Sequence, residues 1–311
     1  MVLGAGGTIA GVAAQGSDGG YTAAQIGVAQ LLAAVPGLER AARGAAVEAE
    51  QVAQIDSKDM THEVWASLAA RCAALLADAK VTGIVITHGT DTLEETAWLL
   101  HSVLRAHKPV VLTCAMRPAT ALSPDGPHNL LDAVTLAAEP SARGVLAVAA
   151  GVVHGAREVY KAHPLRLDAF DSGDGGPLGW VEAGRVRWAH GRAPAEHEPP
   201  HAALAHKLGG RTWPRVEIVM SHAGADGALV DALLARGGVA GIVVAATGNG
   251  TLHAALEQAL MRAARAGVQV RVASRCAQGR MQALQDARWR DADGLSPVKA
   301  RVALMLELMD G

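Results

Sequence analysis

A threonine and an aspartate stand side by side in residues 86–96, ITHGTDTLEET, the most informative segment of the chain. Residues 84–87 predict a buried strand, a His-Gly pair breaks it, and Thr92 opens the T-x-x-E pattern of a helix capping box. Thr90 and Asp91 therefore follow the carboxyl end of a strand and precede a helix, where open α/β sheets bind ligands. A hydroxyl beside a carboxylate suits nucleophilic chemistry, although Asp91 and Thr92 also fit a plain helix cap.

A second strand-to-turn segment opens the chain. Residues 4–11, GAGGTIAG, place Thr8 in a glycine-rich turn whose backbone can approach a ligand closely. The spacing differs from the G-x-G-x-x-G dinucleotide fingerprint, and a Gly/Ser/Asp loop at 15–20 stands where that fold needs a helix. The loop ends at Tyr21, and residues 22–25 predict the cap of the next helix. A mobile loop carrying a tyrosine suits a lid over a site, although Tyr21 also fits an aromatic docked on the core.

The elements that position these residues alternate between strand and helix. We predict strands at 83–87, 110–114 and 144–149, and helices at 61–78, 92–106 and 127–138. After a Pro- and Gly-rich linker at 191–212 come predicted strands at 216–220, 241–246 and 268–274, and helices at 226–236, 251–266 and 297–309. This alternation predicts βαβ units. We expect an α/β protein with a larger N-terminal parallel-sheet domain over 1–190 and a smaller C-terminal α/β domain over 213–311.

Composition excludes several classes of protein. Half of the 311 residues are apolar and only 3% are aromatic, so a sizeable core must be built from aliphatic side chains. The net charge of −2 and the lack of a basic run argue against a nucleic-acid partner. The longest apolar strand run, near 144–153, is too short to span a bilayer.

Cysteine and histidine usage bears on metals and compartment. Cys72, Cys114 and Cys276 are widely spaced, without a zinc-like pattern, so we expect free thiols, the first two buried. The histidines at 190, 197, 201 and 206 are irregularly spaced and fit a solvated surface better than a metal site. We see no signal peptide, although the chain begins inside its first strand. We therefore expect a cytoplasmic location, or a periplasmic one if a signal segment precedes that strand.

Six motifs resemble, in order and spacing, those of the bacterial-type L-asparaginase (asparaginase/glutaminase) family. They are GAGGTIAG (4–11), QIDSKDM (54–60), ITHGTDTLEET (86–96), AMRPAT (115–120), SPDGPHNLLDA (123–133) and GNGTL (248–252). The resemblance covers nearly the whole chain and implies an amidohydrolase that converts L-asparagine to L-aspartate and ammonia through an acyl-threonine. It also implies no cofactor or metal, and a homotetramer whose sites form between two subunits.

The resemblance assigns catalytic roles to five residues. Thr8 matches the family's primary nucleophile, and Tyr21 matches its flexible-loop activator. Thr90, Asp91 and Lys161 match a second catalytic group, in which Asp91 also holds the substrate's α-ammonium. From the sequence alone Lys161, in REVYKAH, reads as a surface cation. The resemblance makes it a base, which requires burial and neighbours to lower its pKa toward neutrality.

The resemblance also assigns substrate-binding positions. Ser57 matches the residue that holds the α-carboxylate, Ala115 a carbonyl that receives the side-chain amide, and Asn249 a residue contributed by a neighbouring subunit. Two positions depart from the family: Lys58 stands where glutamine is frequent, and Asp286 where a glutamate often reaches across the interface. We expect Lys58 to turn toward the α-carboxylate or, alternatively, to point into solvent.

Other functions fit parts of the same pattern. Within the family, a dual glutaminase-asparaginase or the amide-cleaving subunit of a tRNA-dependent amidotransferase are alternatives, although the latter usually carries an extra N-terminal domain. A nucleotide- or amino-acid-binding module that uses the turn at 4–11 without turnover is the alternative from another class. Ammonia release from asparagine would separate an enzyme from such a module.

Overall fold

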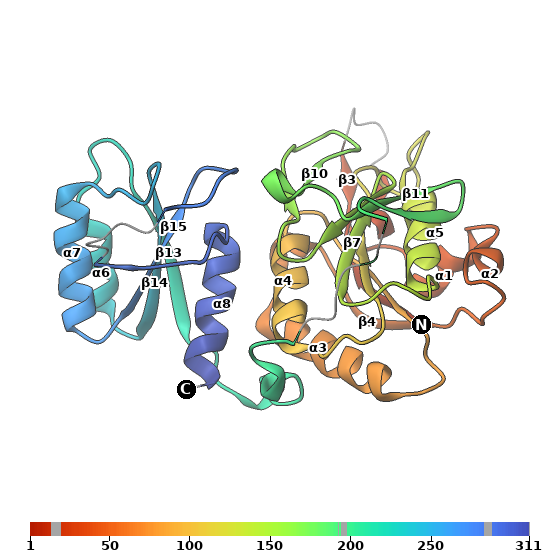
Figure 1. Ribbon diagram of the computed structural model, residues 1–311, viewed down its shortest axis with the longest axis horizontal. Coiled ribbons are helices and arrows are strands. Elements are labelled where there is room, and N and C mark those ends of the chain that lie inside the picture. Colours follow the sequence, from red (N-terminus) through yellow and green to blue (C-terminus); the bar gives the residue numbers. More distant parts are fainter. Residues whose placement is uncertain (14–19, 192, 194–197, 283–287, 311) are drawn as a thin grey trace. The chain divides into compact units, whose positions relative to one another are not determined.

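The computed structural model describes residues 1–13, 20–191, 193, 198–282 and 288–310. The chain divides into two compact units, unit 1 over Met1–Gly209 and unit 2 over Gly210–Gly311. Each unit is an α/β structure, which confirms the predicted fold class (Figure 1). Among the described residues, no helix combines the length and apolar character that crossing a membrane requires.

Unit 1 is built on an eight-stranded sheet in the order β12-β11-β8-β7-β6-β5-β1-β4. Its strands are β1 (Val2–Gly6), β4 (Ala49–Ile55), β5 (Ile84–Thr87), β6 (Val110–Thr113), β7 (Val145–Ala149), β8 (Val152–Gly155), β11 (Gly179–Glu182) and β12 (Arg185–Trp188). The strands from β4 to β7 pair in parallel, whereas β8, β11 and β12 form an antiparallel edge. The sheet is therefore mostly parallel, with antiparallel pairing confined to one side.

The strand connections of unit 1 change direction between β1 and β5. From β1 the chain crosses to β4, and from β4 it passes back over β1 to β5 before continuing to β6 and β7. Where neighbouring connections diverge in this way, the carboxyl ends of the strands border a crevice that binds ligands in open α/β sheets. Thr8 follows β1 and Thr90 follows β5, so both lie at this point.

Helices cover both faces of the unit 1 sheet (Figure 1). α1 (Val28–Ala33), α2 (Leu38–Ala41) and α5 (Gly126–Ala137) lie on one face, and α3 (His62–Ala77) and α4 (Leu93–Val103) lie on the other. Val85 and Val111 of the sheet pack with Leu130 and Val134 of α5. The central strands are buried on both faces, which is why they read as continuous apolar runs.

The strand predicted at 144–149 is confirmed as β7, whereas the helix expected directly after Tyr21 is wrong. The apolar run at 144–153 forms two antiparallel strands, β7 and β8, because Ala150 and Gly151 take positive φ values of 48° and 76° and turn the chain. The helix expected after Tyr21 begins only at Val28, with Gly27 at its N-cap. Before it, the chain forms a small hairpin of β2 (Val12–Ala13) and β3 (Tyr21–Thr22).

Unit 2 holds a four-stranded parallel sheet. Its strands are β13 (Arg215–Met220), β14 (Val239–Ala246), β15 (Gln269–Ser274) and β16 (Arg290–Asp291). α6 (Ala228–Arg236) and α7 (Ala254–Arg265) cover one face, and α8 (Pro297–Asp310) covers the other (Figure 1). Ile242 and Val244 of β14 pack against Leu256 and Leu260 of α7, as expected for a strand whose alternate side chains point to the same face of the sheet.

The remaining short elements lie outside the two sheets. They are β9 (Tyr160–Lys161), β10 (Phe170–Asp171) and the 3-10 turns η1 (Thr8–Ala10), η2 (Ser57–Asp59), η3 (Gly173–Gly175), η4 (Ala202–Leu204) and η5 (Leu208–Gly210). Part of the segment expected as a linker is folded: Leu204 and Leu208 are buried, and the His201 N–H donates to the Ser102 carbonyl. Unit 1 accordingly extends to Gly209.

The cysteines are free, as the sequence predicts. Cys72 and Cys114 are buried, and Cys276 is exposed. Burial raises the pKa of the Cys72 thiol to about 12, so it stays protonated and behaves as a small apolar side chain.

Candidate active site

Two glycines bring the turns after β1 and β5 into direct contact. Gly7 has a φ of +83°, and a Cβ added there would lie 2.4 Å from both Cα and N of Gly89. A Cβ on Gly89 would in turn lie 2.4 Å from Ser57 Oγ. Because neither position has room for a side chain, the two backbones can lie in direct contact. Thr8 and Thr90 each follow one of these glycines, so the contact holds them at neighbouring places.

Tyr21 serves as the partner of the Thr8 hydroxyl. Thr8 is buried, and its Oγ1 lies 2.8 Å from Tyr21 Oη, where either atom can donate. The β2–β3 hairpin, in which Ala13 pairs with Tyr21, returns the tyrosine to the turn that carries Thr8. The Tyr21 side chain is 43% exposed, so it covers the threonine from the solvent side.

Lys161 and Asp91 surround the Thr90 hydroxyl. Lys161 Nζ donates to Thr90 Oγ1 at 2.8 Å and to Asp91 Oδ1 at 2.6 Å. The Thr90 hydroxyl also faces Asp91 Oδ1 at 3.4 Å. The backbone N–H of Lys161 donates to Glu94 Oε2 of α4 at 3.2 Å, which ties β9 to the helix that follows Thr90. The three side chains thus form one group capable of moving a proton.

Ser57 is joined to the Thr90 turn by two hydrogen bonds. The Asp91 N–H donates to Ser57 Oγ at 3.2 Å, and the Thr92 hydroxyl donates to the Ser57 carbonyl at 2.8 Å. The predicted capping box is therefore wrong: Thr92 is the N-cap residue of α4, but its side chain makes no cap bond. Its hydroxyl instead joins the turn to η2, which brings Ser57 beside Asp91.

A buried histidine holds the Thr90 turn from behind, and sequence reasoning missed it. His88 is fully buried; its Nδ1 lies 2.8 Å from the Gly89 carbonyl and its Nε2 lies 2.9 Å from Thr96 Oγ1. The carbonyl can only accept, so Nδ1 donates, and Nε2 accepts from the Thr96 hydroxyl. Trp65 Nε1 donates to Thr96 Oγ1 at 2.8 Å. Burial lowers the pKa of His88 to about 4, which agrees with a neutral ring.

Lys58 lies on the surface of η2. Its Nζ donates to Asp59 at 2.8 Å and to Asp56 at 3.1 Å, and its side chain is 61% exposed. The hydrogen bonds that Lys58 donates to these two carboxylates raise its pKa to about 12. The cation is thus bound by its own neighbours in this structure, while Ser57, next to it in sequence, points inward.

The remaining predicted site residues lie in different parts of the chain. Ala115 is buried in unit 1 with Ile9, the residue after Thr8, in a small apolar cluster. Asn249 belongs to unit 2, where its Oδ1 accepts from the Gln282 N–H at 2.7 Å. Asp286 lies outside the described residues.

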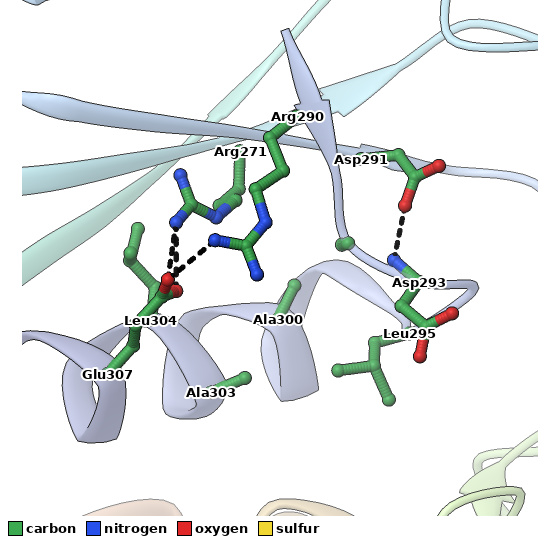
Figure 2. Close-up of a pocket in the computed structure, with 10 residues that line it drawn as sticks. Arg271, Arg290, Asp291, Asp293, Leu295, Ala300, Ala303, Leu304 and Glu307 are labelled. Carbon is green, nitrogen blue, oxygen red and sulfur yellow. Dashed lines mark hydrogen bonds and ion pairs between the residues drawn. The ribbon is translucent and has the colours of Figure 1, made fainter. Parts of the chain in front are cut away.

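A separate cavity of about 300 Å³ lies within unit 2 and contains none of the predicted site residues. Figure 2 shows Arg271 of β15 and Arg290 of β16 converging on Glu307 of α8, with ion-pair distances of 2.8 and 2.7 Å. Glu307 pairs with both arginines, which is typical of a structural ion-pair network. Within the described ranges, no group of three or more His, Cys, Asp or Glu side chains has the geometry to hold a metal ion.

The α/β fold and the paired hydroxyl groups at its crevice have the features of a hydrolase that attacks carbonyl carbon. Residues 1–194 match the family described as Asparaginase, N-terminal, and residues 215–311 match the Glutaminase/Asparaginase C-terminal domain. The chain therefore belongs to the asparaginase/glutaminase family, and it is an amidohydrolase of the L-asparaginase type.

Relatives match over the full length of the chain. L-asparaginase 2 of Escherichia coli (strain K12) is 40% identical over 322 residues, covering 99% of this chain and 88% of that protein. A glutaminase-asparaginase of Pseudomonas fluorescens biotype A is 37% identical, covering 99% and 85%. The crystal structure of a probable cytoplasmic L-asparaginase from Campylobacter jejuni is 38% identical, with a TM-score of 0.89 and coverage of 100% and 94%. These matches confirm the resemblance inferred from the motifs.

Proposed function

We propose that this protein hydrolyses the side-chain amide of L-asparagine, giving L-aspartate and ammonia, with Thr8 as the nucleophile. The observation that carries the proposal is the contact between the two turns. The proposal is supported by two hydroxyl groups on these turns: that of Thr8 lies beside Tyr21, and that of Thr90 lies beside Lys161 and Asp91. The E. coli relative, named L-asparaginase 2, supports asparagine as the substrate.

In the proposed acylation step the Thr8 oxygen attacks the amide carbon, its proton passes to the Tyr21 oxygen, and Tyr21 gives its own hydroxyl proton to the amide nitrogen. The C–N bond then breaks, and the nitrogen leaves as ammonia with that proton. In deacylation, water attacks the resulting ester and Thr8 recovers its hydrogen. Backbone N–H groups at the glycine turns stabilise the oxyanion. In both half-reactions a proton moves across the 2.8 Å contact between Thr8 and Tyr21.

The second group holds the substrate and shuttles protons. Asp91 uses one carboxylate oxygen for Lys161, and its side chain is 52% exposed, so the other oxygen is open to the α-ammonium. Ser57 Oγ lies 3.2 Å from the Asp91 N–H, on the side where the α-carboxylate binds in this proposal. Lys161 acts as a base toward Thr90 only in its neutral form, and the 2.8 Å contact gives it the reach.

The proposal is tested by ammonia release from L-asparagine and L-glutamine by the purified chain. We expect turnover of asparagine and its near-complete loss in Thr8→Ala with the fold retained. Similar kcat/KM values for the two amides would favour the dual activity that the name of the Pseudomonas relative carries. Binding of an amino acid or nucleotide without any ammonia release would instead support the binding module and contradict the enzyme.

We further propose a homotetramer in which Asn249 and Asp286 of one subunit complete the site of another. The support is the family resemblance, together with the division of the chain, which puts Thr8 in unit 1 and Asn249 in unit 2. Mixing inactive Thr8→Ala chains with inactive Asp286→Ala chains should restore activity through hybrid sites. No recovery after verified subunit exchange would show that each site is built within one chain.

We propose a cytoplasmic location. The support is the free state of the three cysteines and the name of the Campylobacter relative, a probable cytoplasmic enzyme. Fractionation of the native host, with the protein detected by antibody, tests it. Recovery in the periplasmic fraction would refute it.

A further inference from the structure

The loop after β6 carries Ala115 and is held from both sides of that residue. On the N-terminal side, Asn129 Nδ2 donates to the Cys114 carbonyl at 3.0 Å. On the C-terminal side, the backbone N–H groups of Met116 and Arg117 each donate to one oxygen of the Asp125 carboxylate, both at 2.9 Å. The peptide groups flanking Ala115 are therefore fixed by two side chains from the start of α5.

These two side chains also support one another. Asn129 Nδ2 donates to Asp125 Oδ2 at 3.2 Å, and Asn129 Oδ1 accepts from the Ala150 N–H at 3.0 Å. The backbone adds to this, because the Thr113 hydroxyl donates to the Asn129 carbonyl at 3.2 Å. Asn129 is 2% exposed, so its amide cannot rotate without leaving buried polar groups unpaired.

The carbonyl oxygen of Ala115 takes no part in these hydrogen bonds. Ala115 is only 1% exposed, yet no residue in the described part of the chain donates a hydrogen bond to its oxygen. Buried carbonyls are normally paired, and an unpaired one at a crevice is a ready acceptor for a ligand N–H. It lies beside Ile9, next to Thr8 in sequence.

We propose that Asp125 and Asn129 are positioning residues that hold the Ala115 carbonyl where it accepts an N–H of the scissile amide. This rests on the proposed function and on the family resemblance, which implies that the Ala115 carbonyl receives the substrate's side-chain amide. The clamp, meaning Asp125 with Asn129, fixes the direction of the acceptor through the peptide groups on either side. It favours a substrate whose leaving group carries an N–H over one whose leaving group carries none.

The consequence is specific to amides. A β-methyl ester of L-aspartate has the same acyl part as asparagine and forms the same acyl-Thr8 when the C–O bond breaks and methanol leaves. Its leaving group offers no N–H to Ala115. Disturbing the clamp should therefore slow asparagine hydrolysis while leaving ester hydrolysis nearly intact, which a general loss of structure would not do.

Isosteric variants disturb the clamp without removing volume. Asp125→Asn turns an amide donor toward the Met116 or Arg117 N–H, and Asn129→Asp places an acceptor against the Cys114 carbonyl. Asp132→Asn is the matched control, because Asp132 is buried on the same helix and, within the described chain, makes no hydrogen bond or ion pair with residues 114–117. All three variants keep the shape of the side chain and change only its hydrogen bonding.

The experiment measures kcat/KM for L-asparagine and for the β-methyl ester in the wild type and the three variants. We expect each clamp variant to lose at least about 10-fold more on the amide than on the ester, and the control to change neither by more than about 2-fold. Hydrogen exchange of residues 114–118 should become faster in the clamp variants only, a readout that needs no activity and can be made on either variant if the other does not fold.

Equal losses on amide and ester, or no loss on either, would overturn the positioning role while leaving the proposed function standing. Unchanged exchange at residues 114–118 would also overturn it. A wild-type chain that turns over neither substrate would instead refute the proposed function, and the inference with it.

Discussion

His88→Gln should remove a pH-dependent part of the stability that the buried imidazole contributes. His88 is fully buried, and burial lowers its pKa from 6.5 to about 4. Between these pH values the unfolded chain binds a proton that the folded chain excludes, so stability rises with pH across that window and is lost as pH falls through it. The difference between the two pKa values corresponds to about 3 kcal/mol of unfolding free energy in total, of which about 2 kcal/mol is lost between pH 7.5 and pH 5.

The assay is urea unfolding of the wild type and His88→Gln at pH 7.5, 6 and 5, at one protein concentration. We expect the wild type to lose about 2 kcal/mol more than the variant between the two extremes. The variant also loses the hydrogen bonds to Gly89 and Thr96, so its stability at pH 7.5 should be lower throughout. The diagnostic quantity is therefore the change with pH, not the stability itself.

His190→Gln is the control, because His190 lies on the surface and its replacement should leave the pH dependence of the wild type in place. If the stabilities of the wild type and His88→Gln fall in parallel as the pH is lowered, the reasoning fails. His88 would then be able to take up a proton in the folded protein, and the neutral tautomer assigned from its hydrogen bonds would be wrong.

Four further changes test other parts of the structure. Thr90→Val should lower kcat for asparagine more than 10-fold, about 1.4 kcal/mol in the barrier, with an unchanged melting temperature; a smaller loss would remove Thr90 from the proposed machinery. Lys58→Gln should raise KM only a few-fold with kcat unchanged, because Lys58 must leave its two aspartate partners to reach the substrate; unchanged constants would return it to the surface. Gly89→Ala should lower the free energy of unfolding, measured in denaturant, by about 1–3 kcal/mol, because the added Cβ would overlap Ser57 Oγ. An unfolding free energy equal to that of the wild type would show that the two turns can separate. Burial raises the pKa of Asp132 to about 6, so the folded chain keeps a proton there below pH 6, and the stability that this proton contributes is lost as the pH rises through 6. Asp132→Asn removes this loss, so the unfolding free energy of the variant should rise more steeply than that of the wild type between pH 4 and pH 6. An equal slope in the two proteins would contradict the raised pKa.

The sequence indicated the layers of both units and the two places where chemistry is concentrated. Strand β5 and helix α4 follow from an apolar run, a His-Gly break and a helical pattern, all of which are local properties. The same holds for the glycine turn that carries Thr8. Since both segments end strands of one parallel sheet, their meeting at the same edge could also be expected.

The local pattern misled where a side chain had a better partner far away. Thr92 has the sequence of a capping box, yet its hydroxyl bonds Ser57, which lies in η2. Propensity describes what a segment prefers alone, and tertiary contacts of a few kcal/mol override it.

What the sequence by itself determined was the α/β architecture and the presence of a threonine after each of two neighbouring strands. What only the tertiary structure decided was which distant side chains contact those threonines and the loop beside them. Lys161 reaches Thr90 across 71 positions, and the Asp125–Asn129 clamp fixes the loop that carries Ala115. Periodicity encodes which face of an element is buried, but it carries no information about which distant polar groups will meet. Those pairs are set when the sheet brings its strand ends to one edge and burial forces each polar atom to find a partner there.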